Sequence, residues 1–233
     1  MAQRIETTQA AVLESIVLPE KIVIPLETEQ TLFVSTATNS TIVLEEGAHL
    51  TFILFCTEGW SETAKLTFEF SGKNSSLQFL AMMIGKGKNH FPFETISRHI
   101  VPQTKAHYFV RAAMFDDSLV DYKGNIIIEK EAQLTDTYLA HHTLLLSDRA
   151  RARTIPALEI EADDVKAGHA ATIGKVDEEL MFYLQSRGIA TKEAEQMLIS
   201  GFFEDQLKLV HDEKIQLSLR ELILKNLPTT LLQ

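Results

Sequence analysis

Short runs of alternating apolar and polar residues fill the chain from residue 20 to about residue 173. These runs are rich in β-branched and aromatic residues and are separated by Gly, Asn and Asp, which is typical of strands joined by turns. The region therefore predicts a structure that is mainly β. We expect strands at 41–44, 50–56, 66–70, 77–82, 107–111, 126–129 and 158–160.

A weak internal repeat accompanies these runs. A small residue followed by a short alternating run recurs at Ala48, Ala64, Ala106, Ala132 and Ala150. The uneven spacing suits a parallel β-helix, because its turns stack on one another while their loops vary in length. A β-sandwich or a jelly roll would show the same alternation, since periodicity alone does not separate these folds.

The pattern changes to helical spacing after residue 176. Asp177 is a candidate N-cap for a first helix, and Gly188 is placed to end that helix in the left-handed conformation. This helix presents one apolar face formed by Leu180, Tyr183 and Leu184. We therefore divide the chain into a β-helix core domain at 1–176 and a C-terminal helical domain at 177–233.

Two further helices are expected in the tail. The second begins at a Thr191 cap, runs to about Val210 and has a packed stripe formed by Ala194, Leu198, Gly201 and Phe202. Phe202 and Phe203 point about 100° apart on a helix, so one of the two rings is left for a partner. The third helix ends before Pro228 and has a packed stripe formed by Ile215, Leu219, Leu222 and Ile223.

Charge and apolar run length limit the kinds of partner. The chain has 22 Lys and Arg against 32 Asp and Glu, a formal net charge of −10, which argues against a nucleic-acid partner. Apolar runs fall short of the roughly 18 residues that span a bilayer, so we expect no membrane partner. Residues 1–17 carry one Arg and two Glu and lack the apolar core of a secretory signal, which favours the cytoplasm.

Three side chains with possible site chemistry are interpreted as structural. Cys56 is the only cysteine, so one chain has no internal disulfide and no cysteine cage for a metal, and its apolar run predicts a buried position. His141 and His142 are adjacent, so in a strand they face opposite sides and do not serve one metal together.

Acidic residues offer an alternative function. Glu159, Glu161 and Asp163 share a face if their strand continues, and paired carboxylates would suit a carbohydrate-active β-helix enzyme. Runs of acidic residues more often form a solvated face, so we favour a protein that is not an enzyme. The chain also lacks a phosphate-binding glycine motif, so ATP hydrolysis would belong to another protein.

A set of ordered motifs near the end of the strand region is more specific. It comprises T-I-P-A-L-E-I from Thr154, A-D-D-V from Ala162, G-H-A-A-T-I-G from Gly168, M-F-Y-L-Q-S-R-G-I from Met181 and E-A-E-Q-M-L-I-S-G-F-F from Glu193. In this order and spacing the segment resembles the C-terminal signature of the SufB/SufD family of iron–sulfur cluster assembly (SUF system) proteins. The runs from Tyr122 and His141 fit more loosely.

The resemblance implies a right-handed parallel β-helix with a C-terminal helical domain, acting as a non-catalytic SufD-like scaffold. It implies pairing of two core subunits through the β-helix, with this chain itself or a SufB-like subunit as the partner. The expected dimer interface contains Val165, His169 and Thr172. It also implies docking of a SufC-like ATPase on the helices, with contact residues Glu193, Met197, Phe202, Phe203 and Leu207.

Departures from the family pattern bear on the metal chemistry. Ala150 and Ala170 stand where cluster-carrying members have a cysteine and a glutamate, and Ala167 stands where SufD-type members often have a cysteine. His169 alone remains, so we expect no cofactor in the isolated chain and, at most, a transient iron–sulfur cluster shared with a partner subunit.

Two alternatives stay open at this point. Packing at the dimer interface is the competing role for His169, and a structural homodimer without a cluster role is the competing function. The resemblance implies an N-terminal helical extension in longer members that we expect to be absent here, so membership of a three-subunit complex is also open.

Overall fold

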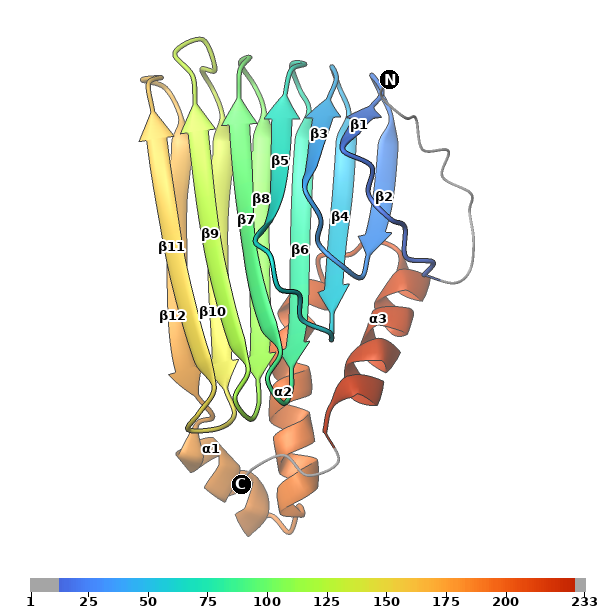
Figure 1. The fold of residues 1–233 in the computed structure, drawn as a ribbon, viewed down its shortest axis with the longest axis vertical. Coiled ribbons are helices and arrows are strands. Elements are labelled where there is room, and N and C mark those ends of the chain that lie inside the picture. Colours follow the sequence, from blue (N-terminus) through green and yellow to red (C-terminus); the bar gives the residue numbers. More distant parts are fainter. Residues whose placement is uncertain (1–12, 229–233) are drawn as a thin grey trace.

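The computed structural model describes residues 13–228. Most of the N-terminal segment 1–17, which we interpreted as lacking a secretory signal, therefore lies outside the described residues. Two parallel sheets of six strands face each other, one from the odd-numbered and one from the even-numbered strands (Figure 1). The odd sheet contains β1 (Lys21–Ile24), β3 (Ser40–Leu44), β5 (Ala64–Phe70), β7 (His90–His99), β9 (Leu119–Ile128) and β11 (Arg151–Ile160). The even sheet contains β2 (Glu29–Val34), β4 (His49–Cys56), β6 (Ser76–Gly85), β8 (Lys105–Met114), β10 (Asp136–Leu145) and β12 (Lys166–Lys175).

Consecutive strands alternate between the two sheets, so each pair of strands makes one turn of a solenoid. Every neighbouring pair within a sheet is parallel, for example β8 with β10 and β10 with β12. The prediction of a parallel β-helix is confirmed, and the sandwich and jelly-roll alternatives are excluded because those folds use antiparallel pairs.

Aromatic side chains stack along the solenoid interior. The Phe52 and Phe79 rings stack with centroids 5.5 Å apart, and the Phe68 ring meets both edge-on. Tyr108 continues this column one turn further, 5.5 Å from Phe79. The alternation read from the sequence arises because each strand sends every second residue into this core. Cys56 is also buried there, as predicted.

A repeated backbone conformation precedes each of the first five even strands. The residue two positions before the strand has a positive φ, at Glu27, Gly47, Asn74, Gln103 and Leu134. Stacked turns are joined by hydrogen bonds such as Gly47 N–H to the Lys73 carbonyl at 2.9 Å and Gln103 N–H to the Gln133 carbonyl at 2.9 Å. This turn, more than the small residues noted in the sequence, is the repeating unit of the fold.

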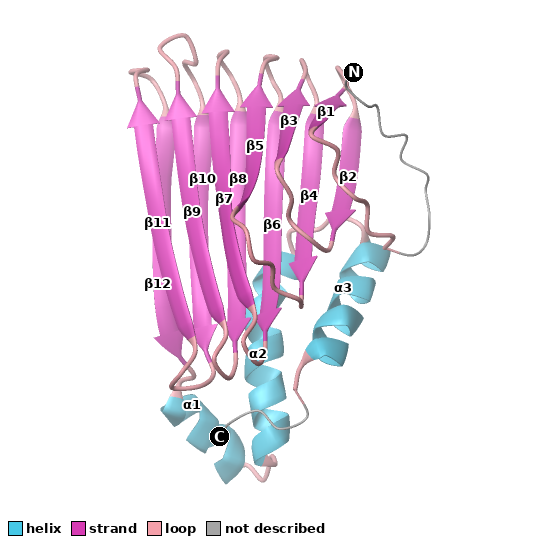
Figure 2. Cartoon of the chain, in the orientation of Figure 1, coloured by secondary structure: helices cyan, strands magenta, loops and turns pink. Residues whose placement is uncertain are grey.

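Three helices follow the strands in the described part of the chain: α1 (Glu178–Ser186), α2 (Thr191–Leu207) and α3 (Glu213–Asn226). α2 and α3 cover the outer face of the even sheet (Figure 2). There Ile199 and Phe203 of α2 share an apolar cluster with Leu80 and Met82 of β6. The helices pack on the solenoid through this cluster, and the division into two domains stays a prediction. None of the helices within residues 13–228 has the length and apolarity needed to cross a membrane.

The helix ends agree with the sequence at two of three points. Asp177 caps α1 by accepting hydrogen bonds from the N–H groups of Glu179 and Leu180, and Gly188 has a φ of +84°. The prediction of a Thr191 cap was wrong. Ala190 is the N-cap of α2 without a side-chain bond, and Thr191 is the first helical residue.

The packed faces of α1 and α2 also differ from the prediction. α1 buries Met181, whereas Leu180 and Tyr183 are exposed. α2 buries Ala194 as expected, but it buries Ile199 and Phe203 in place of Leu198 and Phe202, and it ends at Leu207. Because apolar residues occupy two adjacent stripes of α2, spacing alone did not decide which one faces the sheet.

Candidate functional site

The last turn of the solenoid is open. β11 and β12 are the final strands of their sheets, so within residues 13–228 each has a strand on one side only. Ile160 pairs in register with the fully buried Ile128, yet it is 43% exposed because another turn does not follow it. Ile173 faces the same interior space from β12 and is 48% exposed. Free strand edges beside exposed core residues are typical of an interface.

His169 lies in the middle of this open turn. Its register partner is Leu139, so its ring faces the space between the two sheets, where it is exposed. Thr172 points to the opposite, outer face of the even sheet and bonds to Nδ1 of His142 at 2.6 Å. Val165 directly precedes β12 and packs, half-buried, against the core. The three predicted interface residues therefore belong to one strand region but face different sides.

The three alanines singled out in the sequence, Ala150, Ala167 and Ala170, lie in or beside this turn. Ala150 is buried just before β11, Ala167 shares the inner face of β12 with His169, and Ala170 lies on the outer face. Among residues 13–228 no group of three or more His, Cys, Asp or Glu side chains is arranged to hold a metal. Since iron–sulfur clusters require thiolates, His169 and its surroundings do not fit a cluster held by this chain alone.

The solenoid interior becomes polar near the open end. His141 is buried, and its Nε2 lies 3.0 Å from the Thr143 hydroxyl while its Nδ1 contacts the hydroxyl of Thr154. Burial lowers the pKa of His141 to about 3, so the ring is neutral at pH 7. His142 lies on the opposite face, as predicted. The structural role expected for both is consistent with these hydroxyl partners.

The predicted ATPase-contact residues of α2 divide into exposed and buried ones. Glu193 and Met197 are at the surface, and Met197 is 52% exposed. Phe203 and Leu207 are buried against the even sheet, so their assignment to a docking surface is corrected: their stripe packs within the chain. Phe202 is half-buried beneath the guanidinium of Arg111, whose Cζ lies 5.1 Å from the ring centroid.

α1 contributes an apolar surface that sequence spacing missed. Phe182 is 72% exposed, and Leu180 and Tyr183 are exposed beside it, because Met181 is the residue that packs inward. We group these exposed side chains with Met197, which is also exposed, under the name tail surface: Leu180, Phe182, Tyr183 and Met197. Exposed aromatic residues are typical of binding surfaces. The sequence signal was present, since four consecutive apolar residues at 180–183 exceed one helix face.

The three acidic residues at 159, 161 and 163 do not all share one face. β11 ends at Ile160, so the alternation does not continue to Asp163. Glu159 accepts a hydrogen bond from the Asn125 amide at 3.1 Å on the outer face of the odd sheet. Glu159 and Glu161 line an open hollow of about 720 Å³ there, together with cationic side chains such as Arg98. This arrangement is a mixed-charge sheet face.

Comparison with known proteins identifies the family. The family model described as the SUF system FeS cluster assembly, SufBD core domain, matches residues 24–202, which is most of the chain. The chain belongs to the SufBD family. Its match covers the solenoid from the end of β1 and the helices up to Phe202, so the open turn and the whole tail surface lie inside the SufBD core domain.

Individual SufBD relatives agree. The iron–sulfur cluster assembly protein SufD of Escherichia coli is 30% identical over 160 residues, which is 69% of this chain and 38% of that protein. The SufD of Bacillus subtilis is 35% identical over 121 residues, 52% of this chain and 28% of that protein. A SufBD family protein of Mycobacterium leprae is 33% identical over 142 residues, 58% of this chain and 36% of that protein. The chain matches between 28% and 38% of these relatives' length.

Proposed function

We propose that this chain is a non-catalytic, SufD-like scaffold subunit of iron–sulfur cluster assembly. One observation carries the proposal: a SufBD solenoid whose last turn is left open, with Ile160 and Ile173 exposed at the free edges of β11 and β12. A solenoid with an unfinished end buries that end against another protein. The scaffold then presents its helices on a separate face.

The partner at the open turn is a second copy or a SufB-like subunit. Strand β11 has cations near its start, at Arg151 and Arg153, and an acid near its end, at Glu159. An antiparallel strand added at this edge completes the backbone hydrogen bonds, and it buries the exposed isoleucines. Since both isoleucines are already about half buried, burying the rest of each contributes roughly half of the 1.5–3 kcal/mol that full burial gives.

The tail surface is the docking site for a SufC-like ATPase. Phe182 and Met197 are the most exposed of its side chains, and Glu193 adds a charge at the first turn of α2. Aromatic and methionine side chains dominate the centres of protein interfaces, with charged residues at the rim. The proposed site includes Glu193 and Met197, which the sequence analysis had predicted, and it adds Leu180, Phe182 and Tyr183 of α1.

A cluster is cargo in this proposal. Its thiolates come from the partner subunit, because Ala150 and Ala167 offer none, and the exposed His169 ring is the one imidazole that this open turn offers. The alternative of a structural homodimer rests on the same alanines. Anaerobic reconstitution of the chain plus its partner with iron and sulfide separates the two. Visible absorption that falls with His169→Ala supports a shared cluster that His169 helps to hold. Absorption unchanged by that substitution supports a packing role for His169, and no absorption at all supports a structural homodimer.

Copurification with the SufC-like ATPase of the same organism tests the docking site. We expect the tagged chain to retain the ATPase and to lose it when Phe182→Asp and Met197→Asp are combined. The matched control is Leu26→Asp, which places the same charge on an exposed leucine between β1 and β2, far from the helices (Figure 1). Failure of the unchanged chain to retain the ATPase, or equal loss in the control, would overturn the docking site.

A further inference from the structure

α2 carries two competing apolar stripes. The stripe that faces the even sheet contains Ile199, Phe203 and Leu207, and Gln206 lies beside them. One residue earlier lies a second stripe formed by the half-buried Leu198 and Phe202 and the exposed Asp205. A rotation of the helix by about 100° would exchange the two. Hydrophobic burial favours the observed rotation by only one large apolar residue, since the second stripe still offers Leu198 and Phe202.

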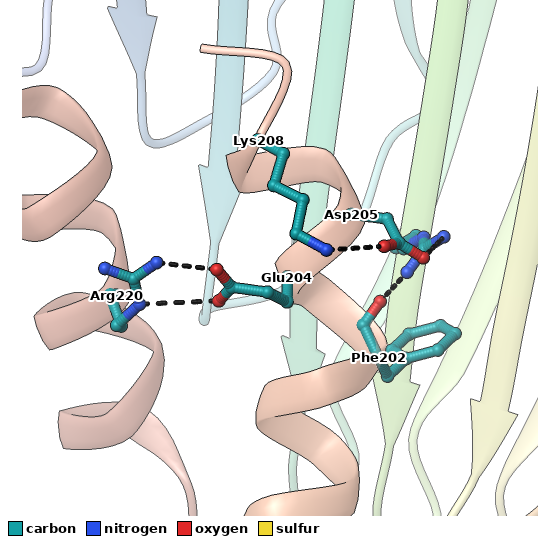
Figure 3. A network of polar contacts seen from close by, with 6 residues as sticks. Phe202, Glu204, Asp205, Lys208 and Arg220 are labelled. Atoms are coloured by element: carbon teal, nitrogen blue, oxygen red, sulfur yellow. Dashed lines mark hydrogen bonds and ion pairs between the residues drawn. The ribbon is translucent and has the colours of Figure 1, made fainter. Parts of the chain in front are cut away.

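Polar contacts distinguish the two rotations. Gln206 is 1% exposed, and its amide donates hydrogen bonds to the carbonyls of Phe109 at 2.6 Å and Ala81 at 3.2 Å. Arg111 of β8 donates to the Phe202 carbonyl and lies 3.4 Å from the carboxylate of Asp205. Figure 3 shows Phe202 and Asp205 on the side of α2 that faces this arginine, and Glu204 directed toward Arg220 of α3. The second rotation would turn Asp205 toward the apolar sheet and break these contacts.

Gln206 also lowers the stability of the folded chain. Its Oε1 is buried without a hydrogen-bond partner among the described residues, which loses free energy relative to an apolar side chain of similar size. Polar residues retained at such a cost in apolar interfaces are known to select one register over its competitors.

We propose that Arg111, Asp205 and Gln206 form a polar latch that selects the rotation of α2. The latch keeps Met197 on the surface and Phe203 against the sheet. Resting on the proposed function, it also sets which side chains α2 shows to a docked ATPase. These are positioning residues, since they act through the orientation of α2.

Thiol labelling of the isolated chain tests the latch without the ATPase. Cys56 is a silent background, because it is buried and its pKa is raised to about 12. Ile199→Cys places a probe on the buried stripe, and Met197→Cys is the exposed reference. Asp205→Leu removes the ion pair and makes the second stripe wholly apolar. We expect it to raise the labelling rate of the Ile199→Cys probe about tenfold or more, with unchanged circular dichroism.

Glu204→Leu is the matched control. Glu204 is also an ion-paired acid of α2, 2.7 Å from Arg220, but it belongs to neither stripe. We expect the probe to stay protected in this variant. Arg111→Gln is a second latch variant, with the same direction of change, in case Asp205→Leu does not fold.

Two results would overturn the latch. One is an Ile199→Cys probe that stays as protected in the folded latch variants as in the unchanged chain. The other is reactivity of Cys56 in the latch variants, since that would indicate loosening of the whole chain and no selective rotation. Failure of the unchanged chain to bind the ATPase, together with a probe that is protected in the unchanged chain and exposed in the latch variants, would contradict the proposed function alone.

Discussion

The ring of His99 stacks on the ring of Phe70 inside the solenoid, with centroids 4.3 Å apart and planes 5° from parallel. Its Nδ1 lies 2.7 Å from the Thr104 hydroxyl, and its Nε2 lies 3.0 Å from the Ser97 hydroxyl. Burial lowers the pKa of His99 to about 3. Together with His141, this places two neutral imidazoles in the core, and each must be protonated when the chain unfolds in acid.

Stability should therefore fall as the pH falls from about 6.5 toward 3. The folded-state pKa lies below the unfolded value, so the contribution of each histidine is present above pH 6.5 and is lost as the pH falls through the folded pKa. Each histidine adds about 1.4 kcal/mol of lost stability per pH unit in that window. Urea unfolding at several pH values measures the slope. The combined variant His99→Gln and His141→Gln should flatten it, and an unchanged slope in that variant would contradict the assignment.

Gly124→Ala should destabilise the solenoid. A Cβ at Gly124 would lie 2.2 Å from Cδ1 of Leu139 and 2.9 Å from the hydroxyl of Tyr122, and both of these side chains are buried in the solenoid interior. Overpacking of this kind costs about 1–3 kcal/mol. Gly174→Ala is the control, since a Cβ there meets no atom within 4 Å. Chemical denaturation should separate the two variants, and equal midpoints would disprove the close approach.

Leu134→Gly should stabilise the chain. Leu134 holds a φ of 61° in the turn before β10, and its side chain is exposed, so little packing is lost with it. Glycine relieves the left-handed strain, which is worth about 1 kcal/mol. Leu26→Gly is the comparison, because Leu26 is also exposed but its φ is not positive. A higher melting temperature for Leu134→Gly alone is the expected result, and a fall in both would refute the strain.

The sequence predicted what depends on local periodicity. Alternation placed the strands, and the caps at Asp177 and Gly188 followed from side-chain chemistry and backbone freedom. The polar interior was not predictable. His99 and His141 point into the core, but the alternation of apolar and polar residues does not distinguish a buried histidine from an ordinary polar strand residue. The faces of α1 and α2 were missed because both helices carry more apolar residues than one stripe holds, and contacts distant in sequence, such as Gln206 with β6 and β8, decide between stripes.

The site was predictable in location more than in detail. Family-like motifs placed it at the last turn and the first helices, which is where the open edge and the tail surface lie. Burial of Phe203 and exposure of Phe182 depend on how the helices pack on the even sheet, and a linear motif contains no such information.

The open last turn is the central claim, and sedimentation velocity tests it most directly. The chain should associate with itself, or with the SufB-like subunit of its organism, and Ile160→Arg combined with Ile173→Arg should abolish that association while the fold is retained. The control Leu26→Asp should leave it intact. A chain that stays monomeric alone and with that subunit, or an association that survives both arginines, would contradict the account.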